Sequence, residues 1–166
     1  MLSDIFWIDT PRRRRLAIMA RPRAGDWLTD EVAGWRNAGV STVASLLERD
    51  EVFDLELREE PILCGRHGIE FLSFPIPDRG VPEMFDARAF ANALLSRLHA
   101  GGSVAIHCRA GIGRSSLVAG AVLVLDGMAA TDALTAITRA RGTPVPDTAA
   151  QTDWLTAFEA MAAGLR

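Results

Sequence analysis

The chain has 166 residues, 49% of them hydrophobic, and a formal net charge of −3. This length is typical of one domain with a sizeable core, so we expect a single domain over residues 1–166. The mildly acidic balance argues against a nucleic-acid-binding protein, and we expect no nucleic acid among its partners.

Residues 5–8 and 16–19 are short apolar runs that predict two strands joined by a turn. The turn carries four consecutive arginines, residues 12–15, which repel one another and must therefore be exposed. We interpret these arginines first as a solvated hairpin tip. The alternative is a patch that attracts an acidic substrate or partner through long-range electrostatics.

A helix and a strand are predicted next. Thr29 has the chemistry of an N-cap, Asp30 and Glu31 follow it in the first turn, and Gly39 lies where such a helix would end. Residues 40–47 are mostly apolar and predict a central strand.

The following segment is less regular. Residues 48–57 predict an irregular helix, and Pro61 opens a short second turn that includes Cys64. Residues 69–76 are rich in Phe and Ile with little alternation, which predicts a strand buried on both faces. Prolines end this strand, and residues 77–82 form a loop.

The second half of the chain alternates a helix around residues 90–98, a buried strand at 104–106 and an apolar helix at 117–125. Thr131 is a predicted cap for a further helix, residues 144–148 form a loop, and the last helix has its apolar stripe at Trp154, Phe158 and Met161. This alternation predicts an α/β fold, with a largely parallel sheet of about four to five strands flanked by helices.

Residues 107–115 form a glycine-bearing loop between the predicted strand and the apolar helix. Such a loop is a natural anion-binding site, because its backbone N–H groups and the helix dipole both favour negative charge. The loop also carries Cys108 and Arg114. A helix N-terminus and a neighbouring cation stabilise a thiolate, and a guanidinium group binds phosphate oxygens in a bidentate manner.

The run His107-Cys108-Arg109-Ala110-Gly111-Ile112-Gly113-Arg114-Ser115 resembles the HCxxGxxR[ST] signature of cysteine-dependent protein tyrosine and dual-specificity phosphatases. The short chain resembles the compact dual-specificity branch. This resemblance implies that Cys108 is the nucleophile and forms a phosphocysteine. The phosphate would then be bound by Arg114 and by the loop residues Arg109, Ala110, Gly111, Ile112 and Gly113. No metal and no other cofactor is expected, because the amides and Arg114 supply the charge stabilisation.

The same resemblance suggests roles for the neighbouring polar residues. His107 would fix the loop geometry through side-chain hydrogen bonds, and Ser115 would donate to the departing thiolate. Asp78, on the loop after a neighbouring strand, is the candidate general acid. Its alternative reading is a plain turn residue, and Asp86 is the competing acid, although its position is more typical of a first helical turn.

Three further residues have weaker signals. Gln151 resembles the glutamine that orients the hydrolytic water in some compact members, or it is a solvated helix residue. Cys64 resembles a resolving cysteine that could form a reversible disulfide with Cys108, or it is a small buried apolar residue. Arg79, beside the expected acid, is a possible substrate contact that adds positive charge together with Arg109.

We therefore expect a phosphomonoesterase that acts on a phosphorylated protein or another phosphomonoester. The alternatives are a phosphatase of phosphoinositides or small phosphoesters, a phosphate-binding protein without turnover and, less favoured by loop length, a sulfurtransferase. Two cysteines and no long apolar run predict a cytoplasmic monomer without stable membrane insertion. All eighteen basic residues are arginine, which is typical of a GC-rich bacterial genome.

Overall fold

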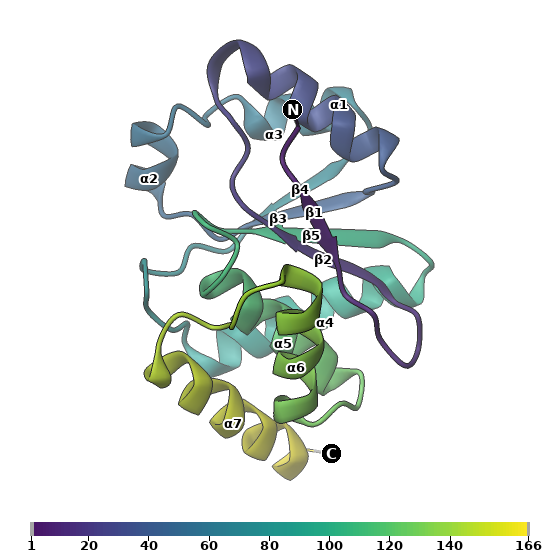
Figure 1. Ribbon diagram of the computed structural model, residues 1–166, viewed down its shortest axis with the longest axis vertical. Coiled ribbons are helices and arrows are strands. Elements are labelled where there is room, and N and C mark those ends of the chain that lie inside the picture. The colour runs from purple at the N-terminus through teal and green to yellow at the C-terminus, as the bar shows by residue number, and fades with distance from the viewer. Residues whose placement is uncertain (1, 166) are drawn as a thin grey trace.

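Five strands form one sheet at the centre of the protein, seen in Figure 1 as a computed structural model that describes residues 2–165. Their order across the sheet is β1-β2-β5-β3-β4. Strand β1 pairs antiparallel with β2 at one edge, and all other neighbours are parallel, which confirms the prediction of a largely parallel sheet. The strands are β1 (Ile5–Trp7), β2 (Arg15–Met19), β3 (Thr42–Ser45), β4 (Glu70–Ser73) and β5 (Ser103–His107).

Helices cover both faces of this sheet, so the α/β class is confirmed (Figure 1). Helices α1 and α3 lie on one face, and the longer α4, α5, α6 and α7 lie on the other. The first group follows a short 3-10 turn, η1 (Gly25–Trp27), and comprises α1 (Leu28–Asn37), α2 (Arg49–Asp54) and α3 (Glu60–Arg66). The second group comprises α4 (Met84–His99), α5 (Arg114–Leu125), α6 (Ala130–Arg141) and α7 (Ala149–Gly164).

Each strand supplies side chains to both faces, because successive side chains of a strand point in opposite directions. In β5, Val104 and Ile106 belong to the apolar cluster under α4–α7, and Ala105 belongs to the cluster under α1 and α3. The alternation continues past the strand end. His107 therefore faces α1 and α3, and Cys108 faces the other side.

Helix α5 is the most buried element, and every residue from Arg114 to Val124 is buried. It packs against α4, α6, α7 and strand β2. Gly120 permits the close approach of α7, because a Cβ there would lie 2.7 Å from a methyl group of Leu155. This packing holds the N-terminus of α5, and the loop that leads into it, in a fixed position.

Two predicted helix starts are wrong. Helix α1 begins at Leu28, so Thr29 lies inside it, and α6 begins at Ala130, so Thr131 lies inside that helix. Neither N-cap residue makes a side-chain capping bond. In both cases the first helical residue is buried, which indicates that packing and not capping sets the start.

The prediction that residues 69–76 form a strand buried on both faces is also wrong. Strand β4 spans Glu70–Ser73, and its side chains are exposed or half-buried. It is the edge strand of the sheet, a position that the apolar composition of the segment could not reveal.

The arginine turn is largely the exposed hairpin tip that was predicted, and Arg12, Arg13 and Arg15 are exposed. Three of its arginines also have structural partners. Arg12 and Arg14 both bind the buried carboxylate of Asp126 at the end of α5, and Arg15 donates to the carbonyl of Ala38. Within residues 2–165 no helix has the length and apolar character needed to cross a membrane.

Candidate active site

The loop from β5 to α5 occupies the carboxyl end of the sheet, as predicted for a phosphate-binding loop between a strand and a helix. Gly111 has a φ of +67°, and a Cβ there would lie 2.5 Å from the carbonyl group of Met19. Only glycine fits this tight approach to β2. Gly113 is the N-cap of α5, so the free N–H groups of the first helical turn lie at the loop.

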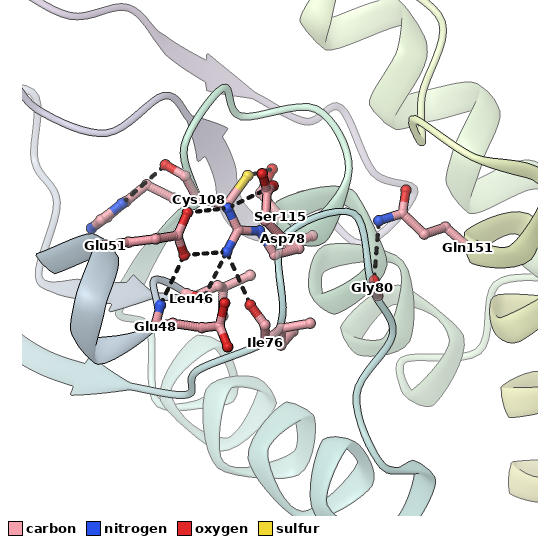
Figure 2. Close-up of polar contacts among 11 residues, drawn as sticks. Leu46, Glu48, Glu51, Ile76, Asp78, Gly80, Cys108, Ser115 and Gln151 are labelled. Carbon is pink, nitrogen blue, oxygen red and sulfur yellow. Dashed lines mark hydrogen bonds and ion pairs between the residues drawn. The ribbon is translucent and has the colours of Figure 1, made fainter. Parts of the chain in front are cut away.

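Arg114 begins α5, and its side chain is only 2% exposed. Figure 2 shows its partners Glu51, Ile76 and Asp78 close together. Glu51 binds it through two parallel hydrogen bonds, in which Nη1 donates to Oε2 at 2.7 Å and Nη2 donates to Oε1 at 2.9 Å. Nη1 also donates to the carbonyl of Ile76 at 2.9 Å. The guanidinium group is therefore held in one orientation before any substrate is bound.

The opposite charges of Arg114 and Glu51 each stabilise the ionised form of the other. Burial lowers the pKa of Arg114, but the hydrogen bonds that it donates to Glu51 and the charges of Cys108, Glu51 and Asp78 raise the pKa above the ordinary value. Burial raises the pKa of the Glu51 carboxyl, but hydrogen bonds from Arg114 and from the Glu48 backbone lower it further than burial raises it. Both groups thus stay ionised over a wide pH range.

Asp78 approaches the same guanidinium group from the loop after β4, with its Oδ1 3.1 Å from Nη2 of Arg114. Its side chain is 51% exposed. A turn closed by a hydrogen bond from Gly80 N to Pro77 O places it there, and the exposed Arg79 occupies the left-handed region at a φ of +58°. Asp86 instead lies in the first turn of α4, as its sequence position indicated.

Cys108 lies at the other end of the loop and is 3% exposed. Its Sγ is 3.5 Å from the hydroxyl oxygen of Ser115, which is fully buried. Arg141 on α6 donates to the carbonyl oxygens of Gly111 and Ala110 at 3.0 and 3.3 Å. The arginine thereby holds these two peptide groups in place, and Arg109 stays exposed on the loop.

Gln151 contacts both the loop that carries Asp78 and the signature loop, residues 107–115, and Figure 2 shows its side chain beside Gly80. It is fully buried and caps α7 in partnership with Thr148. Its amide nitrogen donates to the carbonyl of Gly80 at 3.1 Å, and its amide group contacts the position that a Cβ of Gly113 would occupy. The interpretation of Gln151 as a solvated helix residue is therefore wrong, because the residue is buried and connects the Asp78 loop to the signature loop.

His107 and Cys64 lie on the opposite face of the sheet. The Nε2 of His107 is 2.8 Å from Oε1 of Glu60, and both side chains are buried. Cys64 is fully buried on the same helix as Glu60, and burial together with the Glu60 charge raises the pKa of its thiol to about 12. The two cysteines are free and belong to different apolar clusters, so the structure does not bring them together.

Three residues at the site were missed from the sequence: Glu51, Glu60 and Arg141. Glu51 had a detectable signal, because the spacing Glu48-x-x-Glu51 is similar to a capping box at a helix start. Glu60 and Arg141 have no such local signal, since each acts across the fold. Among the described residues 2–165, no group of three or more His, Cys, Asp or Glu side chains is arranged to hold a metal ion.

The residues of this site lie within a segment that matches a known protein family. The model of a family described as "Polymorphic toxin system, DSP-PTPase phosphatase" matches residues 17–128, which include Asp78 and the whole loop from His107 to Ser115. The chain belongs to this family. The match covers more than half of the chain, so the resemblance to compact dual-specificity phosphatases is confirmed.

The chain is also similar to individual proteins and solved structures. The chain is 27% identical over 125 residues to cyclin-dependent kinase inhibitor 3 of Rattus norvegicus, which covers 74% of this chain and 59% of that protein. Its fold is similar to kinase-associated phosphatase with the catalytic cysteine replaced by serine, at a TM-score of 0.89, 22% identity and coverage of 98% and 97% of the two chains. Tk-PTP in its active form matches with a TM-score of 0.75, 28% identity and coverage of 94% and 96%.

Proposed function

We propose that this chain is a cysteine-dependent phosphomonoesterase that works through a phosphocysteine, with Asp78 as its general acid. One observation carries the proposal: Arg114, at the end of the loop that begins with Cys108, also contacts Asp78. The loop that carries the nucleophile and the phosphate-binding cation thus meets the acid from a second loop at the Arg114 guanidinium group.

In the first step the Cys108 thiolate attacks phosphorus, an S–P bond forms and the bond to the leaving oxygen breaks. The loop amides and Arg114 bind the three equatorial oxygens, on which charge is spread. Asp78 donates a proton to the leaving oxygen. Because a phosphoryl oxygen competes with Asp78 for Nη2 of Arg114, substrate binding would release the carboxyl group for this task.

In the second step a water molecule attacks phosphorus, Asp78 accepts its proton, and the S–P bond breaks. The departing thiolate is stabilised by the hydroxyl of Ser115, 3.5 Å from Sγ, and by the N-terminus of α5. We assign the orientation of this water to Gln151, whose amide lies between the two loops. His107 has the remaining role of holding the loop.

The first test is hydrolysis of p-nitrophenyl phosphate by the wild type and by Cys108→Ser and Asp78→Asn. We expect Cys108→Ser to lose activity to background. Asp78→Asn should lower kcat about 10²- to 10⁴-fold on an alkyl phosphate, and less on p-nitrophenyl phosphate, because a good leaving group needs less protonation.

Asp86→Asn is the matched control, since it removes a carboxyl group from the neighbouring helix start and should leave kcat unchanged. Equal activity of Cys108→Ser and the wild type would falsify the nucleophile assignment. Full activity of Asp78→Asn on the alkyl phosphate would remove Asp78 as the acid. Tight phosphate binding without any turnover would favour the non-catalytic phosphate-binding alternative.

For the substrate we propose a phosphorylated protein side chain or another phosphomonoester with further negative charge. The support is the exposed Arg79 and Arg109 beside the site, together with the similarity to cyclin-dependent kinase inhibitor 3 and kinase-associated phosphatase, whose names connect them with protein kinases. A panel of phosphotyrosine, phosphothreonine and phosphoinositide substrates separates these classes. We further propose a bacterial, cytoplasmic, monomeric protein with one domain, which the two free cysteines and the single sheet support.

A further inference from the structure

Glu60 is a buried carboxylate that the proposed chemistry does not use. It is the first residue of α3, and its side chain is 2% exposed. Around it lie Leu57 and Cys64, both buried. A carboxylate in such surroundings is costly unless it has a specific partner, so its presence needs a physical reason.

Its partner is His107. Within residues 2–165 this is the only basic side chain within ion-pair distance of the Glu60 carboxylate, at 2.8 Å from Nε2 to Oε1. An ionised carboxylate only accepts hydrogen bonds, so a hydrogen bond from His107 to Glu60 requires a proton on Nε2. The imidazole is 0% exposed, and the ring of Trp35 lies 6.4 Å away on the same face.

The other ring nitrogen faces the nucleophile's own backbone. Nδ1 of His107 is 3.4 Å from the carbonyl oxygen of Cys108, and the His107 carbonyl accepts from Leu46 N at 2.9 Å. The ring thus bridges α3 and the first peptide of the loop. Rotation of this ring would remove both contacts at once.

We propose that Glu60 is a positioning residue for the nucleophile. It holds the His107 ring so that Nε2–H donates to Glu60 and Nδ1–H donates to the Cys108 carbonyl, and so fixes the peptide from which the sulfur projects. Glu60 touches neither the sulfur nor a substrate, because it lies on the other face of the sheet. The inference deepens the proposed function and rests on it only for the effect on kcat.

The alternative is that the pair merely attaches α3 to the sheet. The two roles differ in what they change. An attachment alters the free energy of unfolding, whereas a positioning residue alters the reactivity of Cys108 in the folded protein. Helix α3 also has apolar contacts through Cys64, so a variant at position 60 has a good prospect of keeping its fold.

The main test compares Glu60→Leu, which removes the acceptor, with Glu60→Gln, which keeps an acceptor oxygen at the same place. We expect Glu60→Leu to lower kcat about 10- to 100-fold with KM unchanged, the scale of a small misplacement of a reacting group. Its rate of Cys108 alkylation by iodoacetamide at fixed pH should fall as well. Glu60→Gln should recover most of both rates.

Glu59→Gln is the control, because it neutralises the neighbouring exposed carboxylate at the start of α3 and should leave both rates unchanged. If Glu60→Leu folds and keeps the wild-type kcat and alkylation rate, the positioning role is refuted. If the wild type proves inactive as a phosphatase but Glu60→Leu still slows alkylation, the proposed function fails and the positioning role stands.

One measurement needs no substitution. Long-range ¹H–¹⁵N correlation spectra of the wild type report which nitrogens of each histidine ring carry protons. We expect both Nε2 and Nδ1 of His107 to be protonated, because the Glu60 carboxylate and the Cys108 carbonyl oxygen are both acceptors. A ring with a bare Nε2 would overturn the proposal even if Glu60→Leu does not fold.

Discussion

At the scale of single residues, Glu51 determines how Arg114 presents its guanidinium group. Both of its oxygens bind terminal nitrogens of the arginine, and the Glu48 backbone N–H donates to one of them at 3.0 Å. The carboxylate is thus itself oriented by the start of α2. A phosphate would meet an arginine that needs no rearrangement to bind it.

We predict that Glu51→Gln lowers kcat/KM about 10- to 100-fold, because Arg114 loses its bidentate partner and gains rotational freedom. Steady-state kinetics on p-nitrophenyl phosphate measures the loss. Asp54→Asn, an exposed carboxylate of the same helix, is the control and should behave as wild type. An unchanged kcat/KM in Glu51→Gln would show that Arg114 is oriented by its backbone contacts alone.

The same pair has a pH signature. The Glu51 pKa is lowered in the folded protein, so its contribution to stability is fully present above the ordinary value of 4.5 and is lost as the pH falls through the lowered value. We expect the wild type to exceed Glu51→Gln in unfolding free energy by about 2 kcal/mol at pH 7, the scale of hydrogen bonds to a charged group. In urea titrations this difference should shrink below pH 4.5. A constant difference down to pH 3 would contradict the ion pair.

Local sequence reveals the reactive residues of this site better than it reveals their partners. Cys108, Arg114 and Ser115 lie in one contiguous loop, so their spacing is visible in the chain itself. Arg114 meets Glu51 across 63 positions, and His107 meets Glu60 across 47. Such pairs depend on how helices dock on the sheet, which no local pattern records.

At the scale of elements, the start of α7 links three parts of the site. Gln151 closes the capping box with Thr148, and its amide group also reaches the carbonyl of Gly80 and the side of Gly113. The first turn of one helix thereby connects the Asp78 loop to the signature loop. Gln151 therefore has two roles, since it caps α7 and also connects the two loops.

Two variants separate these roles. Thr148→Ala removes the capping hydroxyl but leaves the contact to Gly80. Gln151→Ala removes the contact to Gly80 together with the amide oxygen that accepts from the Thr148 N–H. We predict that each lowers the free energy of unfolding by about 1 kcal/mol, and that only Gln151→Ala also lowers kcat. Thermal unfolding and steady-state kinetics on the same samples provide the comparison. Equal kcat losses in the two variants would assign the whole effect to the cap.

The helices differ in how well the local sequence predicts them. The apolar run after the loop predicts α5 well, because a helix buried on all sides needs only hydrophobic residues. Thr29 and Thr131 misplace two helix starts, since the buried Leu28 and Ala130 extend each helix beyond its candidate cap. The true capping box, Thr148 with Gln151, lies where the pattern indicated only the end of a loop.

At the scale of the whole molecule, the sheet divides the chemistry between two sides. Cys108 is on the side of α4–α7 together with α5, the helix that follows its loop. Cys64 and Glu60 are on the side of α1 and α3. Residues that are close in sequence, such as His107 and Cys108, therefore lie in different environments.

This division predicts selective alkylation. Iodoacetamide at pH 7.5 should modify Cys108 in the folded protein and leave Cys64 intact, because Cys64 is fully buried and its thiol pKa is about 12. Peptide mass spectrometry after a short reaction measures both sites, and the urea-unfolded protein, in which both react, is the control. Modification of Cys64 at the same rate as Cys108 would contradict the arrangement.

The separation of the two thiols has a consequence under peroxide stress. If Cys108 becomes a sulfenic acid, its own face of the sheet offers no second thiol, since the chain has only two cysteines and Cys64 lies on the other face. Repair must then come from a thiol outside the chain, such as glutathione or a small dithiol protein. The recovery of activity would follow the reducing capacity of the surroundings and not a bond formed within the fold.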